Sequence, residues 1–68
     1  MDDNMKSKEL LVNARKALVD ELYAAAIYAR LSKLYRDKKI SSKLERIAEM
    51  ESRHAAFWAK FLDSIVTR

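Results

Sequence analysis

The chain has 68 residues, enough for one small domain, and half of its residues are hydrophobic, which excludes a disordered chain. It contains no cysteine, which excludes disulfides and thiolate metal sites, and its longest apolar run, Leu22–Ala29, is too short to cross a bilayer. The net charge of +4 arises from basic residues that alternate with acids and are dense only at Arg36–Lys39, so a solvated surface is favoured over a nucleic-acid site.

The first predicted element is a long helix from about residue 5 to about residue 36. The chain contains neither glycine nor proline, which favours long uninterrupted helices. Residues spaced alternately four and three apart form a stripe with a period near 3.5, which is typical of a helix in a left-handed bundle. Its members are Ala14, Leu18, Glu21, Ala25, Tyr28, Ser32 and Tyr35. Residues 1–4 are expected to lie outside the regular helix.

Residues 37–40 are predicted to form the connecting turn, and a second helix is predicted from about residue 42 to about residue 66. Ser42 and Glu45 fit the capping-box pattern, which makes Ser42 the expected N-cap. The second stripe again follows three-four spacing. Its members are Leu44, Ile47, Glu51, His54, Trp58, Phe61 and Ile65. A connection this short predicts an antiparallel helical hairpin, with the whole chain, 1–68, as a single all-α domain.

Two helices cannot enclose a core, so the apolar surface of the hairpin predicts a partner. Two copies packed face to face would give a four-helix bundle, which makes the expected assembly a homodimer or larger. Between Leu22 and Ala29 the first helix is apolar on nearly all sides, and Tyr23 and Ile27 lie off the stripe. These two residues are compatible with contacts beyond the dimer.

Glu21, Glu51 and His54 are polar members of the two apolar stripes. Burying such groups is costly unless they bind something. A Glu-x-x-His pair on one helix and a Glu on the next is half of the ligand set of a bundle-type di-iron carboxylate site. A second copy would complete the set with four carboxylates and two imidazoles, so two metal ions per dimer are expected. These donors suit Fe(II), and also Mn(II) or Zn(II).

The predicted helix ends place these residues at only roughly matching levels. At 1.5 Å per residue, Glu21 would lie about 24 Å from the turn, and Glu51 and His54 about 14 to 18 Å from it. Tyr28, one heptad after Glu21, could donate a hydrogen bond to a ligating carboxylate, although a packing role is an equal alternative. Asp20 and Glu49 could guide cations inward or simply be solvated.

Metal-free interpretations of the same residues remain open. His54 could be a core histidine bonded to Glu51 or to the Glu21 of a neighbour, and Glu21 could form a salt bridge with Arg53 or Lys60. Trp58 and Phe61 are expected to be core or interface residues.

The stretches Glu21–Tyr28 (ELYAAAIY) and Ile47–Trp58 (IAEMESRHAAFW) resemble the ferritin-like superfamily. The similarity is to rubrerythrins, to the rubrerythrin-like domain fused to vacuolar-iron-transporter-type membrane proteins, and to two-helix encapsulated ferritins, and it covers about Ala17 to Leu62. It implies iron binding and ferroxidase or peroxidase chemistry by Glu21, Glu51 and His54. The chain departs from rubrerythrins in lacking a second ligand set and a cysteine-ligated iron, and it lacks a transporter domain.

The sequence therefore predicts a di-iron oxidoreductase that oxidises Fe(II) with dioxygen or peroxide. One alternative is a non-enzymatic iron-sensing or iron-delivery module for a transporter or shell protein. The other is a metal-free helical oligomerisation element. No apolar signal region is found at the N-terminus, so the expected location is cytoplasmic, with no direct membrane insertion.

Overall fold

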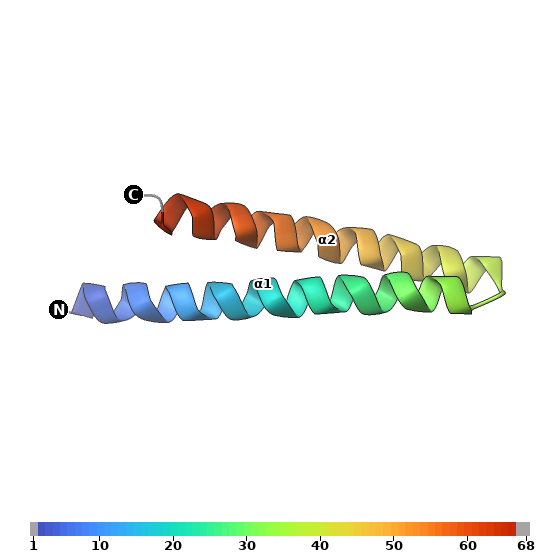
Figure 1. Ribbon diagram of the computed structural model, residues 1–68, viewed down its shortest axis with the longest axis horizontal. Helices are drawn as coiled ribbons and strands as arrows, with labels where there is room; N and C mark the ends of the chain where they lie inside the picture. Colours follow the sequence, from blue (N-terminus) through green and yellow to red (C-terminus); the bar gives the residue numbers. More distant parts are fainter. Residues whose placement is uncertain (1, 67–68) are drawn as a thin grey trace.

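The computed structural model describes the backbone of residues 2–66 and the side chains of residues 7–65. It contains two α-helices, α1 (Asp2–Leu34) and α2 (Lys38–Val66), joined by residues 35–37. The helices run antiparallel and side by side, so that both chain ends lie at the same end of a rod of 54 × 17 × 13 Å (Figure 1). The described residues contain no strand, and the predicted all-α helical hairpin is confirmed.

The helix boundaries differ from the predicted ones. α1 includes residues 2–4, which were expected outside the helix, and it ends at Leu34, two residues earlier than predicted. Met1 lies outside the described residues. α2 begins at Lys38, four residues before the predicted start. The connection is therefore shorter and lies earlier in the chain than residues 37–40.

The early start of α2 follows from capping by Asp37. Its Oδ1 atom accepts hydrogen bonds from the backbone N–H groups of Lys39 (2.8 Å) and Ile40 (3.2 Å). An aspartate in this position satisfies amides that have no partner inside the helix. The prediction of Ser42 as the N-cap is wrong, because Ser42 lies inside α2. Asp37 offers the same chemistry five residues earlier.

A hydrogen bond between the helices fixes the end of the hairpin next to the turn. The hydroxyl of Ser41 donates to the backbone carbonyl of Ser32 at 2.7 Å. This carbonyl belongs to the last turn of α1, where carbonyl groups lack partners within the helix. The side chain of Ser32 in turn donates to the carbonyl of Ala29 at 2.6 Å. The two helices are thus tied together where they approach the turn.

Small residues form the contact between the helices. Ala14, Ser32, Ala48 and Ala55 are the buried residues of the described part of the chain, each at most 8% exposed. Small side chains bring the two backbones close together, but they bury little apolar area. No large side chain among the described residues is fully buried. A single hairpin therefore has no core of ordinary size.

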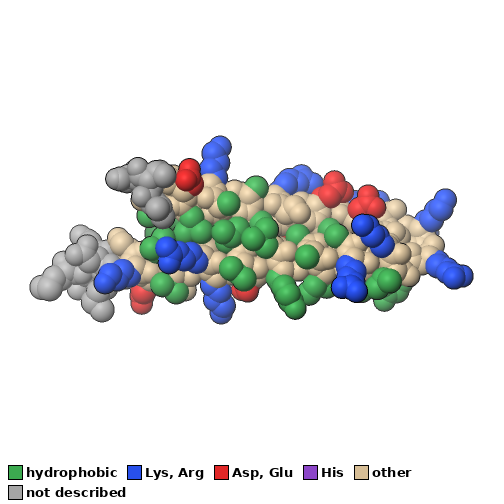
Figure 2. All heavy atoms as spheres, viewed as in Figure 1, with side chains coloured by type: hydrophobic (Ala, Val, Ile, Leu, Met, Phe, Trp, Pro, Cys, Tyr) green, Lys and Arg blue, Asp and Glu red, His purple; other side chains and the backbone are tan. Residues whose placement is uncertain are grey.

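Most of the half-buried side chains belong to the predicted stripes. The stripe residues are buried or half-buried, except for Tyr35 and His54, which are exposed. Tyr35 follows the last residue of α1 and belongs to the connection. Many other large apolar side chains are exposed, and Figure 2 shows hydrophobic side chains along much of the visible face. On α1 they include Val12, Val19, Leu22, Tyr23, Ile27 and Leu34. Within the described residues, neither helix has an apolar stretch long enough to cross a membrane.

Candidate metal centre

The two helix boundaries at the turn bring Glu21 and Glu51 to the same level of the hairpin. Glu21 lies thirteen residues before α1 ends at Leu34, and Glu51 lies thirteen residues after α2 begins at Lys38. At 1.5 Å per residue, both are about 20 Å from the turn. The sequence predicted that Glu21 and Glu51 lie at different distances from the turn. This difference disappears, because α1 ends earlier and α2 starts earlier than expected.

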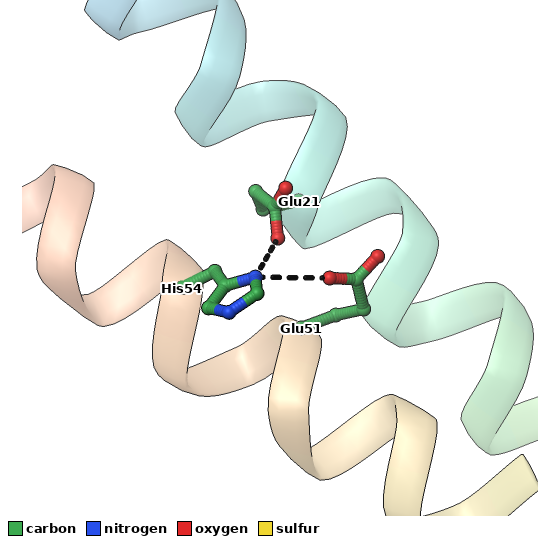
Figure 3. A network of polar contacts seen from close by, with 3 residues as sticks. All are labelled: Glu21, Glu51 and His54. Carbon is green, nitrogen blue, oxygen red and sulfur yellow. Dashed lines mark hydrogen bonds and ion pairs between the residues drawn. The ribbon is translucent and has the colours of Figure 1, made fainter.

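His54 joins the two carboxylates through a single ring nitrogen. Its Nδ1 atom lies 3.1 Å from Oε2 of Glu21 and 3.2 Å from Oε1 of Glu51 (Figure 3). The ligand atoms of all three residues lie within 4.8 Å of one another. The structure thus brings together, within one chain, the three residues that the sequence singled out as metal ligands.

The site lies at the surface of the hairpin and not in its interior. The side chains of Glu21 and Glu51 are 25% and 19% exposed, and that of His54 is 53% exposed. In Figure 3 the other ring nitrogen of His54, Nε2, points away from both carboxylates. The carboxylates are therefore held between the helices, whereas the imidazole covers them from a side that is still open in one chain.

The proximity of the two carboxylates changes the acidity of one of them. A hydrogen bond with Glu21 raises the pKa of Glu51 above its ordinary value of 4.5. Partial desolvation and the negative charge of Glu21 act in the same direction, while His54 opposes them. Without a cation, Glu51 is therefore easier to protonate than an isolated glutamate. A bound cation would act in the opposite direction, because it favours the charged carboxylate.

The spacing of the donor atoms is compatible with a shared metal ion. Imidazole nitrogen and carboxylate oxygen bind such ions at about 2.0 to 2.2 Å, so two ligands at right angles lie about 3 Å apart. The Nδ1–oxygen distances of 3.1 and 3.2 Å agree with this value. They also agree with hydrogen bonds from a protonated Nδ1. The geometry therefore fits both the metal hypothesis and the metal-free hypothesis.

An aromatic cluster of Phe57, Trp58 and Phe61 follows His54 on α2 at three, four and seven residues. The ring centroids of Phe57 and Trp58 are 5.2 Å apart, and those of Trp58 and Phe61 are 5.8 Å apart. Phe57 is 61% exposed, although it stacks on Phe61 with a centroid distance of 6.4 Å. This cluster extends the surface around the site as an exposed apolar patch. Phe57 is not among the predicted site residues, although its spacing of three from His54 places it beside the site.

An open groove elsewhere on the hairpin differs in chemistry. It is lined by small and polar residues. They are Ala25, Ala29, Ser32, Lys33, Ser41, Glu45, Ala48, Glu49, Ser52 and Arg53. The large apolar side chains next to the candidate metal centre have no counterpart in this groove. The groove and the surface around the candidate metal centre are therefore not equivalent as surfaces for a partner.

The remaining predicted residues lie apart from the three ligands. Tyr28 is half-buried, but among the described residues its hydroxyl makes no hydrogen bond to Glu21, so its role stays a prediction. Asp20 and Glu49 are exposed, and Glu49 lines the groove of small and polar residues.

The metal-free alternatives can also be compared with the contacts of His54 and Glu21. In the part of the chain that the structure describes, the ion-pair partner of Glu21 is His54, not Arg53 or Lys60. The polar contacts of His54 are with both glutamates of its own chain, so no neighbouring copy is needed to form them.

Comparison with known proteins gives no match to this chain among family models, curated proteins or solved structures. The resemblance to the ferritin-like superfamily therefore stays a prediction based on the residues quoted above.

Proposed function

We propose that two copies of this hairpin form a four-helix bundle that binds a pair of iron ions and oxidises Fe(II) with dioxygen or peroxide. The observation that carries the proposal is the convergence of Glu21, Glu51 and His54, from two helices, within 4.8 Å. The proposal agrees with the resemblance of the sequence to ferritin-like proteins.

The accessible surface supports a dimer. The chain exposes 6054 Å², whereas a compact protein of 7.9 kDa exposes about 4,400 Å². The excess of roughly 1,600 Å² exceeds the ~800 Å² that each partner buries in an interface of standard size. Pairing through the side that carries His54 and the aromatic cluster would cover Phe57 and neighbouring apolar residues. It would also bring the two candidate centres together.

The donor set of one chain is incomplete for two metal ions. Each chain supplies two carboxylates and one imidazole, so a dimer supplies four carboxylates and two imidazoles, the set found in bundle-type di-iron and di-manganese sites. Oxygen and nitrogen donors also accept Mn(II) and Zn(II). When bound, a pair of iron ions would supply the two electrons that reduce dioxygen to hydrogen peroxide, or hydrogen peroxide to water.

The residues of this chain have distinct roles in this proposal. Glu21 and Glu51 hold the cations with negative charge. His54 binds through Nδ1, the atom that already faces both carboxylates. The aromatic cluster, covered by the partner, keeps bulk water away from the centre and strengthens the electrostatic contacts there.

The test combines metal binding, assembly and turnover in one preparation. The metal-free protein is titrated anaerobically with Fe(II) while its mass in solution is measured, and dioxygen or peroxide is then added while absorbance follows the oxidation. The expected result is two iron ions per dimer and oxidation faster than in buffer. Zn(II), which has no redox chemistry, should occupy the centre and block the reaction.

The two rival functions predict different results in the same experiment. Iron binding without accelerated oxidation would favour a sensing or delivery module. No binding, together with thermal stability that Fe(II) and Mn(II) leave unchanged, would favour a metal-free oligomerisation element, since metal that binds only the folded state must stabilise it.

A further inference from the structure

The positive charge of the chain is concentrated at one end of the rod. Residues 33–46, here called the basic tip, contain six basic and two acidic residues, an excess of +4. The rest of the chain contains eight basic and eight acidic residues and is neutral. The basic residues of the tip are Lys33, Arg36, Lys38, Lys39, Lys43 and Arg46, all of them exposed.

The turn brings the residues of the basic tip together at one end of the rod. The tip comprises the end of α1, the connection and the beginning of α2, which all lie at the end of the rod opposite the chain ends (Figure 1). Basic side chains project outward at this end in Figure 2. An open depression there is lined by Asp37, Lys38, Lys39, Ile40, Ser42, Lys43 and Arg46.

The fold does not account for this charge. The positive end of a helix dipole favours acidic residues, yet the first turn of α2 contains none and starts with Lys38 and Lys39. Among the described residues, no basic side chain of the tip lies within ion-pair distance of an acid. The cations repel one another, and Lys38 and Lys39 oppose the dipole of α2, whereas Lys33 in the last turn of α1 is in a favourable place. A function in binding explains why such a local conflict is present.

The basic tip also exposes large apolar side chains. Leu34 is 68% exposed, Tyr35 is 49% exposed and Ile40 is 43% exposed. These residues lie on both sides of the turn, between the cations. A surface that combines aliphatic groups, a tyrosine and long basic side chains matches the water–lipid boundary, where tyrosine is enriched and lysine and arginine reach the headgroups.

We propose that the basic tip docks on an anionic lipid bilayer. Lysine and arginine side chains bind headgroup phosphates and carboxylates, while Leu34 and Ile40 enter the boundary between headgroups and acyl chains. A nucleic acid offers the same negative charge, but it provides no apolar layer for these two aliphatic side chains. The contact is peripheral, and it depends on neither the metal centre nor its chemistry.

Co-sedimentation of the full chain with vesicles tests the proposal. Binding is expected to vesicles of phosphatidylcholine with phosphatidylserine, to be much weaker to phosphatidylcholine alone, and to fall with salt. The variant Lys38→Gln/Lys39→Gln/Lys43→Gln/Arg46→Gln should bind at least about a hundredfold more weakly, because each cation near the surface contributes several-fold.

A matched control removes four charges elsewhere. The variant Lys8→Gln/Arg15→Gln/Lys16→Gln/Lys60→Gln has the same net charge and should retain most of the vesicle binding. Circular dichroism checks that both variants are helical. Equal losses in the two variants would overturn the proposal, because net charge alone would then govern binding.

The apolar part of the contact is tested separately with Leu34→Ser/Ile40→Ser. This variant should lose vesicle binding about tenfold, since two aliphatic side chains no longer enter the boundary, and it should not change binding to duplex DNA. Two results together would identify a general polyanion site instead. The variant would bind vesicles as well as the natural chain does, and the natural chain would bind duplex DNA as tightly as it binds vesicles.

Discussion

The Nδ1 atom of His54 lies 3.1 Å from Oε2 of Glu21, although 33 residues separate them in the chain. This contact depends on the position of the turn, because equal numbers of helical residues separate Glu21 and Glu51 from it. One inserted residue in α2 between Lys38 and Glu51 would rotate the Glu51–His54 pair by about 100° around the helix. The candidate metal centre is therefore sensitive to helix length in a way that a surface ion pair is not.

Replacing His54 or Glu51 by alanine should abolish iron binding while leaving the helices largely intact. Each change removes one of only three donors in a chain, and neither side chain is part of the small-residue contact between the helices. Metal content after dialysis and helicity by circular dichroism are the measurements. Glu49→Gln, a change at an exposed carboxylate two positions from Glu51, is the control and should bind normally. Iron stoichiometry that survives His54→Ala or Glu51→Ala would show the ligand assignment to be wrong.

The metal-free protein should lose stability as pH rises above the ordinary pKa of Glu51. The folded state holds a proton on Glu51 more tightly than the unfolded state, whose pKa stays near 4.5. The contribution of Glu51 to stability is thus largest below pH 4.5 and is lost as pH rises through the raised pKa of the folded state. Glu51→Gln should remove this part of the pH dependence and raise the melting temperature of the metal-free protein at neutral pH.

Thermal unfolding with chelator across this pH range gives the comparison. The difference between the natural chain and Glu51→Gln isolates the contribution of Glu51 from that of other titrating groups. Metal affinity should show the opposite trend and increase with pH, because the cation displaces a proton. A melting temperature that Glu51→Gln lowers at neutral pH would contradict the expected sign.

Phe57→Ser should weaken dimerisation by about 2 kcal/mol, the size typical of an aromatic residue near the centre of an interface. Phe57 belongs to the exposed aromatic cluster beside His54, which the proposed partner covers. Tyr23→Ser is the matched control, because Tyr23 is an aromatic residue that is 70% exposed but does not belong to the aromatic cluster beside His54. Sedimentation equilibrium measures both dissociation constants. If both changes weakened the dimer equally, or if only Tyr23→Ser weakened it, the interface would lie on another side of the hairpin.

Asp37→Ala should destabilise the folded protein by about 1 kcal/mol, the usual effect of losing an N-cap. Two backbone amides, those of Lys39 and Ile40, lose their acceptor in this variant. Ser42→Ala should be neutral or slightly stabilising, because Ser42 lies inside α2 and alanine is the better helix former there. Chemical denaturation of both variants measures the difference. A larger loss of stability in Ser42→Ala than in Asp37→Ala would instead identify Ser42 as the N-cap.

Some errors in the sequence prediction have a physical cause at the turn. Asp37 and Ser42 both carry side chains that can cap a helix, and the capping-box spacing of Ser42 and Glu45 favoured the wrong one. Capping at Asp37 adds four residues to α2, and the level of Glu51 relative to Glu21 depends on that length. The exposed position of His54 was likewise not visible in its stripe, because periodicity gives the direction of a side chain and not what covers it.

The sequence by itself determined two antiparallel helices, the stripes that face each other, and three candidate metal ligands on them. These features follow from the 3.5-residue period and from side-chain chemistry, which are local properties. Only the tertiary structure decided that the helices meet through alanine and serine, that Asp37 begins α2, and that one nitrogen of His54 faces both Glu21 and Glu51. These depend on how the turn aligns two distant segments, and residue spacing within each helix does not specify that alignment.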